Sequence, residues 1–490
     1  MFFRMVYDDT LAQAAYVIGC QRTGEAIVVD PERDVDRYTS LAAANGLRIT
    51  AATETHIHAD FLSGSRELAE RTGARLYLSD EGGSDWRYGW LKSRRDGGAY
   101  DAMLLKDGTS FRVGNIELKA LHTPGHTPEH MAFVVTDRGG GAGEPMGVLT
   151  GDFVFVGDLG RPDLLETAAG VRGVKEGFAR TLARSARDFG SMADYLQVWP
   201  AHGAGSACGK ALGAVPQSTV GYEKRFNPAL SLAGDERRFV EFILEGQPAP
   251  PLYFARMKHQ NRDGVPLLGE LPRPRRLTGP ELLSLDGTRL AVVDTRSWAA
   301  FRDGHLPASL WAPTGNQFPM VTGSYIEPEE RIVLVCDEPH VEEFTRNLVR
   351  IGLDRVEAYA TPADVGALGA SRLETTPEIQ PEAFKGELVR RAPAILDVRN
   401  EHEFSAGAIP GAMNIAHTRL APRVAELPIG ARIVCHCRSG VRSGAATAFL
   451  RRRGHDVINL AGGYLAWEKA AGPTTIPGAV ASKAGCACRE

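Results

Sequence analysis

Histidine and aspartate alternate at positions 56, 58 and 60, directly after an apolar stretch (residues 47–53) that is typical of a β-strand. Side chains at alternate positions leaving a strand point the same way, so His56, His58 and Asp60 can converge on one point. Imidazole and carboxylate are the usual protein ligands of zinc and iron. Three later groups, each where an apolar run meets glycine or proline, contain His126, Asp152 and His202. Together these groups predict a metal site on loops at strand ends.

The composition narrows the classes of protein to consider. The chain has 490 residues, which suggests about three domains. Lysine plus arginine (56) nearly balance aspartate plus glutamate (60), which argues against nucleic acid or an anionic membrane as the partner. No apolar run approaches the roughly 18 residues that span a bilayer, and the amino end lacks a secretory apolar core. Seven unevenly placed cysteines do not make a disulfide framework, so we expect a soluble protein of the reducing cytoplasm.

The predicted metal ligands must be held by a layered α/β domain, because short apolar runs alternate with helical patterns up to about residue 228. A helix is expected over residues 62–71, ended by Gly73, and strands over 14–18, 116–121 and 131–135. The glycine-rich residues 138–144 lie between two strand-like runs. We interpret them as a hairpin loop rather than a phosphate-binding loop.

The order of these motifs (HxHxD, PGH, TGD, AHG) resembles the metallo-β-lactamase fold, an αββα sandwich, over the whole first domain. In two-metal hydrolases of that fold a histidine follows HxHxD, but here the position is Phe61. A phenyl ring offers no electron pair to a metal, so we expect a single metal. By this resemblance His56, His126 and Asp152 are its ligands. Two imidazoles and one carboxylate leave open positions and suit Fe(II) with O2 as co-substrate.

The resemblance therefore narrows to the persulfide dioxygenases of that superfamily, which oxidise a thiol persulfide to thiol and sulfite. By the same likeness His58, Asp60 and His202 orient the metal ligands and the bound substrate. Arg161 matches the arginine that meets the carboxylate of the thiol, although a surface ion pair is the alternative. His130 either lines the substrate pocket or is a core histidine with satisfied hydrogen bonds.

Cys208 follows His202 in a stretch of small residues (201–209) that would let the backbone approach a ligand closely. A thiol there could accept or relay sulfane sulfur, and the resemblance to persulfide dioxygenase–rhodanese fusions favours this catalytic role. The alternative is a small buried apolar group. Cys20 has no comparable surroundings and is expected to be structural.

Two segments of the second half repeat each other. Residues 292–296 (VVDTR) are echoed by 395–399 (ILDVR), and Asp294 precedes Asp397 by 103 positions while Cys336 precedes Cys437 by 101. The repeat predicts a domain duplication, with each copy a parallel sheet covered by helices on both faces.

The second copy carries the chemistry. Its loop, residues 437–443 (CRSGVRS), follows a strand and opens a helix expected over residues 444–453. A thiol there faces backbone N–H groups and the positive end of the helix dipole, which favour its thiolate, and two arginines suit an anionic sulfur donor. The loop resembles that of rhodanese sulfurtransferases over residues 377–471, which makes Cys437 the persulfide-carrying nucleophile. The substrate-binding residues are predicted to be Arg438, Ser439, Gly440, Val441, Arg442 and Ser443.

The spacing inside the loop distinguishes sulfur chemistry from phosphate chemistry, and the other cysteines of the second half lack such a loop. Cysteine phosphatases place five residues between cysteine and arginine, whereas Cys437 and Arg442 have four between them, which favours sulfur chemistry. Cys435 is expected to pack at the strand end. In the first copy, acidic residues and a proline follow Cys336, so this copy is expected to be inactive. The tail cysteines, Cys486 and Cys488, make a weak metal site by themselves.

The whole chain thus resembles fusions of a persulfide dioxygenase, an inactive rhodanese-like domain and an active rhodanese. The expected boundaries are residues 1–228, a helical connector at 229–275, rhodanese-like domains at 276–374 and 375–473, and a flexible tail at 474–490. The expected activity consumes O2 at one Fe(II) per chain and converts persulfide to sulfite. The rhodanese would interconvert persulfide, sulfite and thiosulfate, completing a route of sulfide detoxification.

The sequence leaves two other functions open. One is a hydrolase of the glyoxalase II kind fused to a rhodanese, which needs two metals. The other is a non-catalytic sulfur carrier or sensor. The predicted partners are a low-molecular-weight thiol persulfide, sulfite and thiosulfate, with no nucleic acid and no membrane. We also expect a homo-oligomer, although the sequence gives neither its size nor the identity of the thiol.

Overall fold

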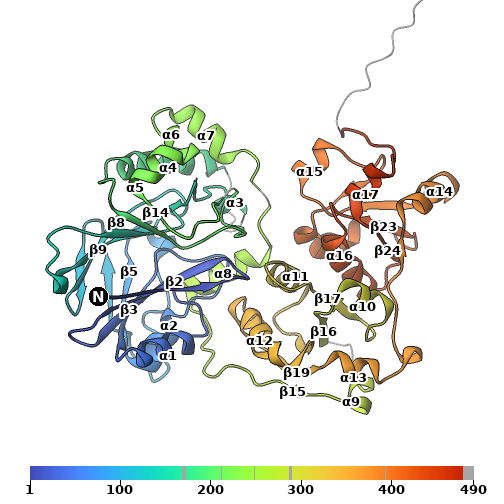
Figure 1. Ribbon diagram of the computed structural model, residues 1–490, viewed down its shortest axis with the longest axis horizontal. Coiled ribbons are helices and arrows are strands. Elements are labelled where there is room, and N and C mark those ends of the chain that lie inside the picture. Colours follow the sequence, from blue (N-terminus) through green and yellow to red (C-terminus); the bar gives the residue numbers. More distant parts are fainter. Residues whose placement is uncertain (168–172, 211, 248, 286–289, 392, 478–490) are drawn as a thin grey trace, which may run out of the picture. The chain divides into compact units, whose positions relative to one another are not determined.

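The computed structural model (Figure 1) describes residues 1–477 apart from 168–172, 211, 248, 286–289 and 392. The tail cysteines at 486 and 488 therefore lie outside the described residues. The chain divides into two compact units, each described by itself below. Unit 1 holds Met1–Arg276, Thr314–Ile332 and Asp337–Tyr359, and unit 2 holds Leu277–Pro313, Val333–Cys336 and the residues from Ala360.

Two six-stranded sheets organise the first 230 residues of unit 1. The first has the order β1-β2-β3-β4-β5-β6, with strands Phe2–Asp8, Gln13–Cys20, Glu25–Val29, Arg48–Thr53, Arg75–Ser79 and Ala102–Leu105. The second has the order β14-β13-β10-β9-β8-β7, with strands Ser218–Thr219, Gln197–Pro200, Gly147–Gly151, Met131–Asp137, Ile116–His122 and Ser110–Val113. A two-stranded sheet pairs β11 (Val154–Phe155) with β12 (Asp158–Leu159).

Alternating side chains explain why the sheets stack. In β2, Tyr16 and Ile18 join a core with residues of the second sheet, while Ala15 and Val17 face a separate core with helices. In β9, Phe133 likewise belongs to the core that both sheets share. Because a strand alternates its side chains with period two, apolar residues at every position bury both faces. This is the αββα sandwich that the resemblance implied.

Helices cover the two outer faces (Figure 1). On the first sheet lie α1 (Asp36–Ala44) and α2 (Ser65–Thr72), and on the second lie α4 (Lys175–Gly190) and α7 (Glu236–Leu244). The predicted helix over 62–71 starts three residues late, because residues 61–64 form the loop that leaves the metal-ligand motif, and it ends at Gly73 with φ 69°. Residues 138–144 join antiparallel β9 and β10, which confirms the predicted hairpin.

Nine further helical elements belong to unit 1 in the described part of the chain. They are η1 (Ser84–Trp86), η2 (Arg138–Gly140), α3 (Leu164–Thr167), α5 (Val220–Phe226), α6 (Pro228–Ser231), α8 (Tyr253–Asp263), α11 (Gln317–Tyr325), η3 (Glu338–His340) and α12 (Val341–Arg350). Among the described residues, no helix is both long and apolar enough to cross a bilayer.

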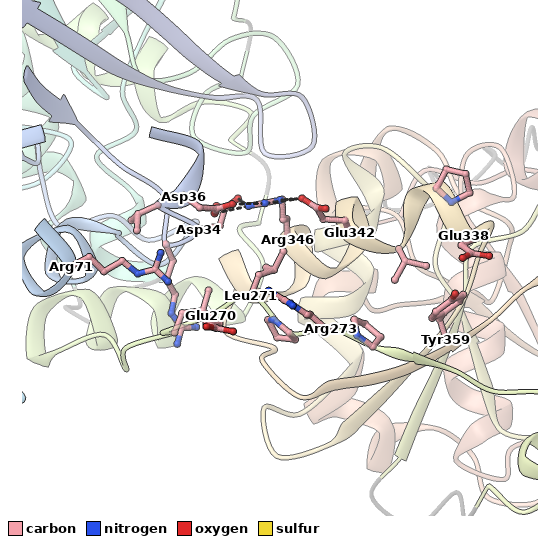
Figure 2. Close-up of a pocket in the computed structure, with 17 residues that line it drawn as sticks. Asp34, Asp36, Arg71, Glu270, Leu271, Arg273, Glu338, Glu342, Arg346 and Tyr359 are labelled. Atoms are coloured by element: carbon pink, nitrogen blue, oxygen red, sulfur yellow. Dashed lines mark hydrogen bonds and ion pairs between the residues drawn. The ribbon is translucent and has the colours of Figure 1, made fainter. Parts of the chain in front are cut away.

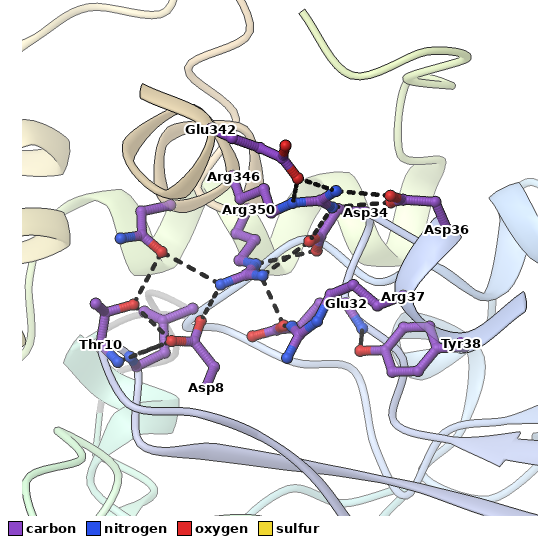
Figure 3. Close-up of polar contacts among 12 residues, drawn as sticks. Asp8, Thr10, Glu32, Asp34, Asp36, Arg37, Tyr38, Glu342, Arg346 and Arg350 are labelled. Carbon is purple, nitrogen blue, oxygen red and sulfur yellow. Dashed lines mark hydrogen bonds and ion pairs between the residues drawn. The ribbon is translucent and has the colours of Figure 1, made fainter. Parts of the chain in front are cut away.

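An arginine on α12 holds three buried carboxylates of unit 1 together (Figure 3). Arg350 Nη1 lies 2.7 Å from Asp8 Oδ2, Nη2 lies 2.8 Å from Asp34 Oδ2, and Nε lies 3.3 Å from Glu32 Oε2. The Arg350 backbone carbonyl also accepts a hydrogen bond from the Leu62 N–H at 2.7 Å, just beyond the metal-ligand motif. Breaking a buried ion pair from one side leaves uncompensated charge, so this contact is a strong constraint on unit 1.

Two five-stranded parallel sheets follow the same order in the second half, which confirms the predicted duplication. The first is β15-β19-β18-β16-β17, with strands Arg275–Arg276, Val356–Ala360, Arg331–Val335, Leu290–Asp294 and Ser309–Trp311. The second is β20-β24-β23-β21-β22, with strands Glu378–Ile379, Val457–Leu460, Ile433–His436, Ala394–Asp397 and Met413–Asn414. Residues 275–276, which span the expected boundary between the connector and the first rhodanese-like domain, form the edge strand of the first of these sheets.

The helices of unit 2 are α9 (Gly279–Leu283), α10 (Trp298–Asp303), α13 (Pro362–Gly366), η4 (Ala370–Arg372), α14 (Pro381–Arg391), α15 (Glu401–Ala406), η5 (His417–Arg419), η6 (Ala421–Glu426), α16 (Val441–Arg452) and α17 (Gly463–Lys469). The helix predicted from residue 444 begins at Val441 instead. Gly440 takes the left-handed backbone (φ 98°) that ends the loop early, so Arg442 and Ser443 belong to the first helical turn.

Candidate metal centre

Three loops of unit 1 bring the predicted ligands together. His56 follows β4, His126 lies between β8 and β9, and Asp152 follows β10. Asp152 Oδ2 is 3.9 Å from His56 Nε2 and 3.5 Å from His126 Nε2. One donor atom from each residue lies within 4.8 Å of the others, and all three residues are buried. Two imidazoles and a carboxylate thus face one point, as the sequence predicted.

A chain of hydrogen bonds that runs from His56 through Thr55 to the accepting carboxylate of Asp30 sets the tautomer of His56. The Thr55 hydroxyl donates to Asp30 Oδ2 at 3.0 Å and therefore accepts the hydrogen of His56 Nδ1, also at 3.0 Å. This arrangement leaves the lone pair of His56 on Nε2, the atom that faces Asp152. Burial together with the neighbouring histidines keeps the pKa of His56 well below its usual value, so the ring is neutral. A neutral imidazole is the form that binds a metal.

His58 points elsewhere in the same loop. Its Nε2 contacts Asp30 Oδ1 at 3.1 Å. Burial lowers the pKa of His58, but the charge and hydrogen bond of Asp30 outweigh it and raise the pKa to about 9. His58 is therefore paired with Asp30, which supports an orienting role beside the ligands.

A second group of donors lies next to the first. His202 Nε2 is 3.3 Å from Asp60 Oδ2 and 3.4 Å from Asp152 Oδ1, and the Cys208 sulfur completes a set within 4.8 Å. Burial and the nearby carboxylates of Asp60 and Asp152 raise the pKa of the Cys208 thiol well above its usual value. Cys208 thus lies beside Asp60 and His202 as a protonated thiol.

The cluster fits a divalent cation. Both carboxylate oxygens of Asp152, Asp60 Oδ2 and His202 Nε2 are buried without a hydrogen-bond partner. Leaving buried polar atoms unpaired is costly, and a cation at the centre of the cluster would satisfy them. Burial and the charge of Asp60 raise the pKa of Asp152 to about 6, the direction that a bound cation would reverse.

Phe61 occupies the position of the missing histidine. Its side chain is fully buried, and its ring centroid lies 4.4 Å from that of His58. The side chain offers no donor atom, so the second group has one ligand fewer than a two-metal site of this kind requires.

Helix α8 of the connector holds the loop that carries His56, His58 and Asp60, called the metal-ligand loop below. The sequence did not predict this contact. Asn261 Nδ2 donates to the carbonyls of His58 (2.8 Å) and Phe61 (2.7 Å), and Asn261 Oδ1 accepts from the Ser63 N–H at 2.8 Å. Asn261 is 1% exposed. An asparagine inside a helical pattern was the available signal, but its partners lie about 200 positions earlier.

Arg161 and His130 have partners inside the chain. Arg161 is buried, and its Nε and Nη2 donate to the Asp163 carboxylate at 3.1 and 2.6 Å while Nη1 donates to the Ala207 carbonyl at 3.0 Å. His130 Nε2 accepts from the Asp152 N–H at 3.1 Å, and its Nδ1 lies 2.8 Å from Thr123 Oγ1. His130 therefore matches the geometry of a satisfied core histidine that fixes the backbone of Asp152.

Unit 2 contains the predicted nucleophile. Cys437 follows β23 at the N-terminus of α16, where its sulfur accepts the Gly440 N–H at 3.2 Å and lies 3.5 Å from Ser443 Oγ. Arg442 forms two ion-pair hydrogen bonds to Glu403, at 2.7 and 2.8 Å. Arg438 is exposed at the loop. The loop thus presents N–H groups and positive charge to a buried sulfur.

The other cysteines occupy the surroundings that the sequence suggested. Cys20 belongs to the core between the two sheets, and Cys435 is fully buried, which raises the pKa of its thiol. Cys336 follows β18, and the next residues, Asp337 and Glu338, lead into a 3₁₀ turn. No cysteine of the described part of the chain forms a disulfide.

A cavity of unit 1 with a volume of about 900 Å³ is shown in Figure 2, and none of the predicted metal ligands lines it. Its lining mixes both charges, and Arg346 binds Asp34, Asp36 and Glu342 across it at 2.6–2.9 Å. Because these charges already neutralise one another, we assign no ligand to this cavity.

Comparison with known proteins places these two sites in context. Residues 8–194 match the model of the Metallo-beta-lactamase superfamily, and residues 380–470 match that of the Rhodanese-like domain. The chain is 28% identical over 240 residues to the human mitochondrial persulfide dioxygenase ETHE1, covering 48% of this chain and 78% of that protein. It is 29% identical over 255 residues to a beta-lactamase hydrolase-like protein of Xylella fastidiosa strain 9a5c, covering 48% and 53% of the two chains.

A solved structure extends the likeness beyond the first domain. The crystal structure of a metallo-beta-lactamase from Staphylococcus aureus subsp. aureus COL is 41% identical to this chain, with a TM-score of 0.65. The match covers 74% of this chain and 99% of that one.

Proposed function

The chain belongs to the metallo-β-lactamase superfamily and carries a C-terminal rhodanese-like domain, and from this premise we propose a two-step sulfur enzyme. In the first step a thiol persulfide is oxidised with O2 to thiol and sulfite, at a site where His56, His126 and Asp152 would hold a non-haem Fe(II). The rhodanese then passes sulfane sulfur to sulfite, giving thiosulfate. The observation that carries the proposal is the buried set of two imidazoles and one carboxylate beside Phe61.

The first step consumes one persulfide, one O2 and one water, and it releases thiol, sulfite and two protons. His56, His126 and Asp152 would hold the iron, which supplies the open coordination positions and the redox chemistry that O2 requires. The chain's own contribution is orientation. Asp30 fixes His56 through Thr55, and His130 fixes the Asp152 backbone.

The second step uses Cys437. Its thiolate attacks the outer sulfur of a persulfide and releases the thiol, which leaves a persulfide on Cys437. Sulfite then attacks that outer sulfur, the S–S bond breaks, and thiosulfate leaves while the thiolate of Cys437 is restored. The Gly440 N–H, 3.2 Å from the sulfur, and the α16 N-terminus stabilise the negative charge at each stage. Joining both sites in one chain raises the effective concentration of sulfite at the rhodanese.

Metal counting together with product analysis tests the proposal. Protein reconstituted anaerobically with Fe(II) should bind one iron per chain and consume O2 only when a persulfide such as glutathione persulfide is added. Cys437→Ser should keep O2 uptake and accumulate sulfite in place of thiosulfate. Two zinc ions per chain, with thioester hydrolysis and no O2 uptake, would overturn the proposal.

One observation favours a second candidate, a two-metal hydrolase. Asp60, His202 and Cys208 form a second group of three donors beside the first. The same metal count decides between the two candidates, because a hydrolase of this kind needs both positions filled.

The remaining parts of the proposal concern partners and location. We propose a low-molecular-weight thiol persulfide, sulfite and thiosulfate as the reacting partners, and a reducing compartment, the cytoplasm, as the setting. A homo-oligomer is proposed for the assembly, which light scattering would measure.

A further inference from the structure

A small cavity of unit 1 lies against the metal-ligand loop and is not used by the reaction steps above. Its volume is about 260 Å³, slightly below the roughly 300 Å³ at which pockets for drug-sized ligands begin. It therefore suits a small molecule or one end of a larger one. The residues that matter in its lining are Ile57, Trp86, Phe178, Lys258, His259 and Arg262.

The cavity is close to the metal ligands. Ile57 stands between His56 and His58 in the sequence, so one wall of the cavity is the ligand loop itself. Lys258, which lines the same cavity, belongs to α8, the helix whose Asn261 holds the ligand loop through the carbonyls of His58 and Phe61.

Lys258 is a buried cation that faces this cavity. Its residue is 8% exposed, and Nζ lies 4.1 Å from the centroid of the Trp86 ring. Among the described residues, no hydrogen bond or ion pair within contact distance is found for this Nζ. Burial lowers its pKa to about 8 although Glu129 opposes the shift, so the amine is mostly charged at pH 7. The buried carboxyl group of Glu129 acts on this charge without contacting Nζ, so Nζ is available to pair directly with an anionic group in the cavity.

The rest of the lining fits an organic anion. Trp86 and Phe178 supply aromatic surface. Arg262 also lines the cavity, but its guanidinium is paired with Asp263 at 2.7 and 2.9 Å, so Lys258 supplies the positive charge for a ligand. The guanidinium of Arg161 is likewise engaged, by Asp163 and the Ala207 carbonyl.

We propose that this cavity binds the carrier part of the thiol persulfide, with Lys258 Nζ paired to an anionic carboxylate or phosphate of the carrier. The inference rests on the proposed function for the identity of the ligand. Trp86 and Phe178 pack against the apolar part of the carrier, and the persulfide sulfur extends past Ile57 toward the ligand loop. Lys258 is a specificity-determining residue, supplied by the connector helix α8 rather than by the sandwich.

The test compares charged and uncharged carriers. For Lys258→Met we expect the KM for glutathione persulfide or coenzyme A persulfide to rise at least tenfold, with kcat changed less than threefold. The kcat/KM for the persulfide of 2-mercaptoethanol, whose carrier has no anionic group, should stay within twofold. A loss confined to glutathione persulfide identifies a carboxylate as the bound group, and one confined to coenzyme A persulfide identifies a phosphate. Equal losses on charged and uncharged carriers, or no loss on either charged one, would overturn the proposal.

Binding of the unreactive thiols separates this inference from the proposed function. Calorimetry with reduced glutathione and with coenzyme A should show binding of at least one thiol to the wild-type protein. Affinity should fall at least tenfold in Lys258→Met and recover within threefold in Lys258→Arg. If no persulfide supports O2 uptake while this binding pattern holds, the proposed function fails and the cavity assignment survives. If neither thiol binds, or if Lys258→Met binds as tightly as the wild type, the cavity assignment fails.

Discussion

At the scale of single residues, environment decides the chemistry of groups that the sequence shows only by type. Arg161 and Lys258 are both cations near the metal-ligand cluster, yet one is engaged by Asp163 and the other faces a cavity. His130 was expected either in a pocket or in the core, and both of its ring nitrogens have partners. The motifs and the resemblance they carry predicted the trio His56, His126 and Asp152, which the structure brings together, whereas these roles depend on neighbours that are distant in sequence.

His417 predicts a pH dependence for unit 2. Burial, helped by the charge of Arg442, lowers its pKa to about 4 from a usual value of about 6.5. Between these values the unfolded chain binds a proton that the folded chain does not, so stability is full above pH 6.5 and falls as the pH drops. We expect about 2 kcal/mol less stability from this residue at pH 5 than at pH 7.

Hydrogen exchange of the β23 and α16 peptides at the two pH values measures this loss, after correction for the intrinsic exchange rate. In His417→Leu the loss of stability between pH 7 and pH 5 should be smaller by about 2 kcal/mol. Glu403 does not interfere, because its pKa lies below the usual carboxylate range: burial raises it, but the hydrogen bonds from Arg442 lower it more. The same loss of stability in the variant as in the wild type would show that His417 is not its source.

At the scale of elements, the connector helps to hold the metal-ligand loop, a role that its sequence does not suggest. Residues 229–275 were expected to be a helical connector, and α7 at residues 236–244 is one of its helices. The role of α8 was not predictable, because Asn261 acts on loop carbonyls about 200 positions away. Similarly, the start of α16 depends on the positive φ of Gly440, which a hydrophobic pattern does not report.

Asn261→Ala should loosen the metal-ligand loop. The change leaves two buried carbonyls and the Ser63 N–H without their partner, and each such group costs about 1–3 kcal/mol. Because groups that orient ligands influence metal affinity, we expect iron affinity to fall about 10- to 100-fold. Competition with a chelator, followed by metal analysis, measures this fall. Asp263→Asn, at the exposed end of the same helix, serves as the control and should keep its iron.

At the scale of the whole molecule, the resemblance carried by the order of the metal-site motifs predicted the sandwich, and the internal repeat predicted the two parallel sheets. The grouping of the described residues into units was not predictable. Residues 337–359 belong to unit 1, where Arg350 pairs with Asp8 across 342 positions of sequence. Long-range ion pairs of this kind leave no local pattern for a reader of the sequence.

Arg350→Met tests how much unit 1 depends on α12. The variant leaves Asp8, Glu32 and Asp34 buried without their shared cation, and breaking a buried pair from one side costs about 3–5 kcal/mol. Arg112→Met removes an exposed pair with Glu117 and should cost no more than about 1 kcal/mol. Urea unfolding of unit 1 compares the two variants, and equal losses would show that the buried cluster does not stabilise the unit.

The position of Arg350 has a consequence for how such a chain can evolve. A gene cut between the sandwich and α12 would produce a protein whose amino-terminal portion keeps Asp8 and Asp34 in its interior without the α12 arginines that balance them, whereas Glu32 keeps Arg37. Recombination at that point should therefore be disfavoured, and descendants that inherit one half should inherit the other.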